Sequence, residues 1–147
     1  MEKPDGSTRY AVEVGDILDG RLCGLGKRTY EVSGHTEQGE FVNGKLVKGT
    51  VTFVNGRMEE GERVNGRLHG QGKRTFDDGY KEEGDFVDGK LVKGTVTFVD
   101  GHIEEGEFVK GYLHGQGKMT FPGDYVQEGD FVNGELVKGT VTFVDGH

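Results

Sequence analysis

Hydrophobic residues are scarce in this 147-residue chain, at 32% of the total. That fraction is too small for a thick two-layer core and favours a thin sheet. No apolar run approaches the length of about 20 residues that spans a bilayer. Residues 1–6 are polar, unlike a secretory signal. We therefore expect a soluble, cytoplasmic protein.

Cysteine is scarce as well, and the 18 basic residues are outnumbered by 26 acidic ones. The single cysteine, Cys23, excludes an internal disulfide and is compatible with a reducing compartment. The net charge of −8 disfavours nucleic-acid binding. It also disfavours anionic membranes, because attraction to such lipid is about 1 kcal/mol per nearby basic residue. Low hydrophobicity with net charge is typical of disorder, but the phenylalanines and valines recur in fixed register, which indicates a folded chain.

The most prominent feature of the chain is its internal repetition. Residues 84–102 return as residues 129–147 with two changes, Asp88 to Asn133 and Lys90 to Glu135. A recurring Gly-[Glu/Asp]-x-x-x-Gly-x-Leu pattern defines six units, the last one truncated. Residues 1–14 are left as an N-terminal cap and first strand. The units begin at Gly15, Gly39, Gly61, Gly84, Gly106 and Gly129.

Each unit has the pattern of a β-hairpin. Dipeptides such as Asp88-Gly89 lie between alternating segments and suit a type I′ turn. A second turn, such as residues 77–79, closes the unit. Pairing across the two kinds of turn places Phe86 opposite Leu91, Gly70 opposite Phe86, and Val92 opposite Phe108. It also places Lys73 opposite Glu83, Arg74 opposite Glu82, and Gly72 opposite Gly84.

We therefore predict an all-β fold, an elongated single-layer antiparallel meander of stacked β-hairpins. Even units are one residue shorter than odd units between the leucine and the aromatic residue. A one-residue difference reverses the faces of a strand unless the strand bulges. We expect a bulge near Val92-Lys93 and at the equivalent positions.

Residues 106–121, Gly-Glu-Phe-Val-Lys-Gly-Tyr-Leu-His-Gly-Gln-Gly-Lys-Met-Thr-Phe, carry a family resemblance. They resemble the MORN repeat (membrane occupation and recognition nexus), and the likeness covers residues 15–147. It implies a twisted single-layer sheet, often dimeric, that serves as a cytoskeletal or membrane-contact scaffold or as a non-catalytic region of a larger enzyme. The usual Tyr-x-Gly opening is replaced here by acidic residues before the glycine, such as Glu83 and Glu105.

Three sets of residues resemble chemical sites. Cys23, His69 and His114 share one repeat position, but they lie about 19 Å apart at four strand spacings, too far to share a metal. The acidic clusters at residues 59–62, 82–85, 104–107 and 128–130 face basic residues, which favours a solvated charge ladder over a calcium site. Gly-Gln-Gly-Lys precedes no helix, so it lacks the anion site of a phosphate loop. We expect no metal, no cofactor and no catalysis.

Aromatic residues supply the candidate interaction face. We expect them to stack over glycines and one another as the core, with part of the row left open for docking. This candidate face comprises Phe41, Phe53, Phe76, Phe86, Phe98, Phe108, Phe121, Phe131 and Phe143.

The last strand supplies a candidate oligomer edge. It has no returning partner in the sequence, which favours self-association or continuation of the chain beyond His147. The edge residues are Leu136, Thr140, Val141, Thr142 and Phe143.

These features predict a non-enzymatic scaffold that binds unidentified protein partners. The alternatives are a membrane-surface or phospholipid-binding module and the regulatory repeat region of a larger enzyme. The resemblance adds cytoskeletal or membrane association to the expected cytoplasmic location.

Overall fold

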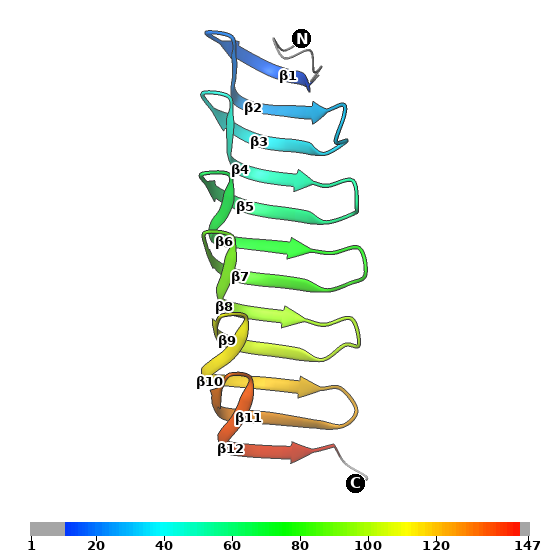
Figure 1. Ribbon diagram of the computed structural model, residues 1–147, viewed down its shortest axis with the longest axis vertical. Helices are drawn as coiled ribbons and strands as arrows, with labels where there is room; N and C mark the ends of the chain where they lie inside the picture. Colours follow the sequence, from blue (N-terminus) through cyan, green and yellow to red (C-terminus); the bar gives the residue numbers. More distant parts are fainter. Residues whose placement is uncertain (1–10, 145–147) are drawn as a thin grey trace.

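The computed structural model describes residues 11–144 as one open sheet of twelve antiparallel strands in sequence order (Figure 1). The described residues contain no helix, and the predicted meander is confirmed. The predicted cap of residues 1–14 lies largely outside the described residues, except that its end begins β1. The strands are β1 (Ala11–Leu18), β2 (Arg21–Tyr30), β3 (Thr36–Val42), β4 (Lys45–Thr52), β5 (Met58–Val64), β6 (Arg67–Thr75), β7 (Lys81–Val87), β8 (Lys90–Thr97), β9 (Ile103–Val109), β10 (Tyr112–Phe121), β11 (Tyr125–Val132) and β12 (Glu135–Phe143).

Two kinds of turn alternate along the two sides of the sheet (Figure 1). Two-residue turns join each odd strand to the next even one, and Asp88 (φ 49°) and Gly89 (φ 82°) are typical of them. Positive φ at both positions is the type I′ geometry that the sequence predicts. The longer turns, such as residues 76–80, lie on the opposite side of the sheet. There the Phe76 amide donates to the Tyr80 carbonyl at 2.8 Å.

The predicted register is confirmed across β6, β7 and β8. Gly70 lies opposite Phe86, and Lys73, Arg74 and Gly72 lie opposite Glu83, Glu82 and Gly84. One predicted pair is wrong. Pairing between β8 and β9 begins at Lys93 and Glu107, so Val92 has no partner in β9.

A bulge accounts for that difference. Val92 is the extra residue between the pairs Leu91–Phe86 and Lys93–Asp85, so the predicted bulge is confirmed. The longer units also bulge, which the sequence did not indicate: in β6, residues 69–71 face Glu62 alone. In both kinds of unit, the glycines beyond the bulge therefore lie directly opposite each other, as Gly61 and Gly72 do in one and Gly84 and Gly94 in the other.

One glycine from each strand enters a single row that crosses the whole sheet. Each glycine lies directly opposite the next, and the strands approach closely there. A β-carbon on Gly84 would lie 2.2 Å from the Lys93 carbonyl oxygen and 2.7 Å from the Gly94 α-carbon. The row is Gly15, Gly26, Gly39, Gly49, Gly61, Gly72, Gly84, Gly94, Gly106, Gly117, Gly129 and Gly139.

The strands bend at this glycine row. Leu68 and Gly72 are four residues apart in β6, which is about 13 Å in a straight strand. A β-carbon on Gly72 would nevertheless lie 3.2 Å from Cδ2 of Leu68. The segments on the two-residue-turn side therefore fold over the rest of the sheet, as the turned ends of the strands in Figure 1 show.

The inner side of the bend holds the core, which consists of two clusters of buried side chains. One cluster contains Leu22, Phe41, Leu46 and Val51. The other contains Leu68, Phe86, Leu91, Val96, Phe108, Leu113, Met119 and Phe131. Strand β5, which lies between them in the sheet, contributes no residue to either cluster, and the third unit contributes Leu68 alone.

Gly84→Ala tests the close approach at the row. Gly84 has φ +145° and its new methyl group would meet backbone atoms, whereas Gly111 has φ +85° with no atom within 4 Å. Both substitutions strain the backbone by about 1–3 kcal/mol. We expect Gly84→Ala to lower the free energy of unfolding at least twice as much as Gly111→Ala in denaturant titrations. Equal losses would show that the close approach contributes nothing.

Candidate functional site

The predicted interaction face divides into a buried part and a part at the surface. The prediction is wrong for the buried part. Phe41, Phe86 and Phe131 are 1% exposed and Phe108 is 6% exposed. They fill the inner side of the bend, so a partner cannot reach them, and they are core residues. The other members lie near the longer turns. Phe53, Phe76, Phe98 and Phe121 are half-buried, and Phe143 is 64% exposed.

These remaining aromatic residues belong to a longer stack, here called the aromatic ladder. Tyr80 lies between Phe76 and Phe98, with ring centroids 5.3 and 5.4 Å away. His102 stacks between Phe98 and Phe121, at 4.0 and 5.0 Å. Tyr125 continues the stack to Phe143. A shorter run contains Tyr30, His35 and Phe53.

The sequence revealed only half of this ladder. Its alternate rungs come from the residue that follows each longer turn, and these were not included in the predicted face. The available signal is the pairing across residues 77–79, which places Phe76 opposite Tyr80 when it is extended to the turn. In the second unit this position holds Arg57, whose guanidinium lies 4.1 Å from the centre of the Phe53 ring, a cation–π contact. The omitted rungs are His35, Arg57, Tyr80, His102 and Tyr125.

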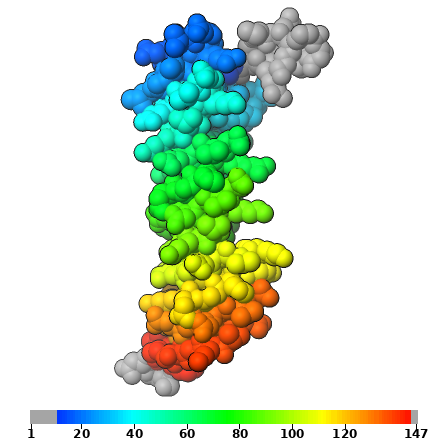
Figure 2. Space-filling model, turned by 90° about the vertical axis from the view of Figure 1, so that its left-hand side faces the viewer, coloured from blue at the N-terminus to red at the C-terminus, as the bar shows by residue number. Residues whose placement is uncertain are grey.

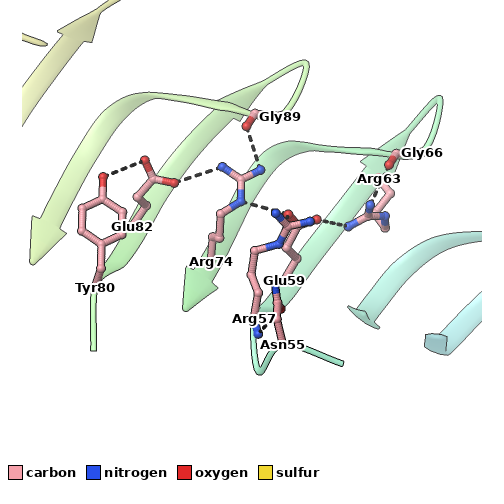
Figure 3. A network of polar contacts seen from close by, with 9 residues as sticks. All are labelled: Asn55, Arg57, Glu59, Arg63, Gly66, Arg74, Tyr80, Glu82 and Gly89. Carbon is pink, nitrogen blue, oxygen red and sulfur yellow. Dashed lines mark hydrogen bonds and ion pairs between the residues drawn. The ribbon is translucent and has the colours of Figure 1, made fainter. Parts of the chain in front are cut away.

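A buried charge cluster, drawn in Figure 3, is centred on β5, the strand that contributes no residue to either hydrophobic cluster. The third unit has Arg63 where most units have phenylalanine. Glu59 is 5% exposed and accepts hydrogen bonds from Arg63 at 3.0 Å and Arg74 at 2.9 Å. Arg74 also donates to Glu82 at 3.0 Å and to the Gly89 carbonyl at 2.8 Å.

These contacts set the protonation of the cluster. Burial alone would raise the pKa of Glu59, but the hydrogen bonds and charges of Arg63 and Arg74 outweigh it, so the pKa lies below its ordinary value of 4.5. Burial, with the neighbouring Glu82 carboxylate, raises the pKa of Tyr80 to about 12. Glu59 is thus ionised near neutral pH, when it is a weak proton acceptor.

The acidic residues form two rows along the sheet. The prediction of a solvated charge ladder is wrong for the row that contains Glu59 and Glu82, and it holds for the row that contains Glu60, Glu83 and Glu105. Glu59 is buried, and Glu82 is half-buried against Arg74. Glu60, Glu83 and Glu105 alternate with that row and are exposed. The bend explains the division, because one face of each strand points into the fold and the other into solvent.

A shallow cleft of about 460 Å³ lies next to the charge cluster. Arg28, Tyr30, Glu37, Lys45 and Arg63 are among its lining residues. Both guanidinium groups are already bonded: Arg28 contacts Glu13 at 2.7 Å and Glu37 at 3.0 Å, and Arg63 contacts Glu59. The cleft is therefore a weak candidate for an anion site.

The remaining candidates occupy ordinary strand positions. Cys23, His69 and His114 are half-buried in β2, β6 and β10. Within residues 11–144, no group of three or more His, Cys, Asp or Glu side chains could hold a metal ion. Gly70 to Lys73 lies inside β6. The part of the chain that the structure describes also has no helix long and apolar enough to cross a membrane.

In a comparison with protein families, the chain matches the family described as MORN repeat. Each matched segment begins one residue before the glycine that opens a unit. No curated protein matches the chain. The matched segments are residues 14–34, 38–57, 60–79, 83–103, 105–123 and 128–147.

Glu59→Gln tests the charge cluster. Removing one partner of a buried ion pair typically costs about 3–5 kcal/mol, because the other charge stays buried. We expect a loss of this order at pH 7, and Glu60→Gln, at an exposed neighbour, should change stability by less than about 0.5 kcal/mol.

The pH dependence of stability gives a second test of the contribution of Glu59. The folded-state pKa of Glu59 is lowered, so its contribution is present above the unfolded pKa and is lost as pH falls through the folded one. Thermal melts should show a smaller acid-side loss for Glu59→Gln than for the parent. An unchanged acid profile would contradict the assigned role.

Proposed function

Because this chain belongs to the MORN-repeat family, we propose that it is a non-enzymatic scaffold that binds an elongated protein partner along the aromatic ladder. The observation that carries the proposal is the continuity of the ladder from Phe76 to Phe143. These rings repeat at each hairpin along one side of the sheet. A partner that follows the long axis would meet the same kind of contact at successive units.

The chemistry around the ladder favours a partner with basic and apolar side chains. Stacked rings offer apolar edges and faces that attract cations. The turn residues beside the ladder include Asp77, Asp78, Asp100 and Asp124, all exposed. The net charge of −8 adds long-range attraction for a basic partner.

The charged groups of the fold support the non-enzymatic part of the proposal. Glu59 is the one charged residue of the described chain that is fully buried, and two arginines hold it ionised. The other acidic row is in solvent. The arginines hold the pKa of Glu59 below its ordinary value, whereas general acid catalysis near pH 7 requires a carboxyl whose pKa is raised.

The double variant Phe76→Ala/Tyr125→Ala tests the ladder. Both rings are half-buried and stack in the ladder, but neither packs against the core cluster, unlike Tyr80, Phe98 and Phe121. We expect the variant to lose proteins that the parent captures from a cell extract by cross-linking. Val87→Ala/Val109→Ala, at exposed sites near the two-residue turns, should retain them.

Vesicle flotation separates the proposal from its membrane alternative. The parent should not float with vesicles of anionic or neutral lipid at moderate salt. Flotation that depends on anionic lipid would contradict the proposal and favour a membrane-surface module. Capture that is equal for the parent and the ladder variant would show that partners bind elsewhere.

A further inference from the structure

Both ends of the sheet present a strand edge without a neighbour among the described residues. Within residues 11–144, β1 pairs with β2 alone and β12 pairs with β11 alone. All of β1 is exposed, as is all of β12 except the half-buried Leu136. Such an edge carries free N–H and C=O groups and favours pairing with another strand.

The side chains at these ends occupy positions that the interior of the array buries. Val141 is 40% exposed, whereas its equivalents Val51 and Val96 are 2% and 4% exposed. Ile17 is 53% exposed, whereas Phe86, its equivalent, is 1% exposed. Each end therefore displays half of a contact that inner hairpins complete. The two halves are different surfaces, at opposite ends of the molecule (Figure 2).

We propose that the β12 edge of one copy pairs with the β1 edge of a second copy, head to tail. The register is the one that joins β4 to β5 and β8 to β9 within the chain. The number of strands permits this arrangement. With twelve antiparallel strands, β1 of the next copy has the direction that a thirteenth strand requires.

Side-chain chemistry matches across the proposed junction. Between β8 and β9, Lys93 lies opposite Glu107, Gly94 opposite Gly106, and Val96 opposite Glu104. The pairing between β4 and β5 has the same three types of pair. In the same register, β12 and β1 of the next copy would pair Lys138 with Asp16, Gly139 with Gly15, and Val141 with Glu13.

The junction would thus continue the glycine row from one copy into the next. It would also place an acid opposite Lys138, as the interior does for Lys48 and Lys93. Charge complementarity of this kind fixes register and partner choice more than it adds affinity. Burial of Val141 and Ile17 would supply the apolar contribution.

A two-fold contact between two β12 strands fits less well. With Gly139 opposite its own copy, Lys138 would face Thr140, and Val141 would face the bulged residue Val137. Lys138 would then have no acidic partner. Since a head-to-tail contact does not close on itself, copies would add in an open series and form filaments.

Two charge reversals test the junction. Lys138→Glu alone places two acids opposite each other, and Asp16→Lys alone places two lysines opposite each other. In sedimentation velocity on residues 1–147 at low salt, the parent should grow beyond a dimer with concentration. Each variant alone should need at least about tenfold more protein for the same growth.

Mixing the two variants distinguishes the head-to-tail contact from others. In the mixture, the glutamate introduced in one variant meets the lysine introduced in the other, and the remaining ends meet as in the parent. We expect an equimolar mixture to regain the growth of the parent. Lys90→Glu is the matched control, because it makes the same charge change at an exposed site where the last unit already has Glu135.

Three results would overturn the proposal. One is a parent that stays monomeric at every concentration, and another is a parent that stops at a closed dimer. The third is a mixture that assembles no better than its separate components. Circular dichroism of each variant before mixing shows whether the fold is retained, so loss of assembly through unfolding is recognised directly.

Discussion

The fold depends on the close approach of backbones along one row of paired glycines. Each strand contributes one glycine, and each lies opposite the next from Gly15 to Gly139. At Gly84 and Gly94 the neighbouring carbonyl oxygens occupy the space that a side chain would need. The bend that results brings leucine and phenylalanine side chains over the glycines. A sheet with few hydrophobic residues thereby gains an interior, which a flat single layer lacks.

The third unit shows how the array tolerates a change in one hairpin. Arg63 replaces the usual phenylalanine, and Glu59, Arg63 and Arg74 fill the same inner space with a bonded cluster. Because each hairpin contacts mainly its neighbours, such a change stays local in a repeat array. It divides the hydrophobic core into two clusters without interrupting the strand order.

Sequence reasoning found the elements and their pairing, because those depend on local signals. Turn dipeptides such as Asp88-Gly89 fixed the hairpins, and the difference in unit length located the bulge at Val92. It missed the direction in which the strands bend. For that reason Phe86, which the sequence places on the interaction face, is buried, and so is Glu59, which the predicted charge ladder places in solvent. The alternate rungs of the aromatic ladder, such as His102, were missed because their stacking depends on positions across a turn and not on strand periodicity.

Nuclear Overhauser effects between leucine methyl groups and glycine α-protons within one strand test the bend most directly. We expect them for Leu22 with Gly26, Leu68 with Gly72, and Leu113 with Gly117, where a β-carbon on the glycine would lie 2.9–3.2 Å from the leucine side chain. In a straight strand, residues four apart are about 13 Å from each other, too far for these effects. Their presence in all three strands would establish the bend at the glycine row. Their absence, with the cross-strand glycine contacts retained, would show a flat sheet and contradict this account of the core.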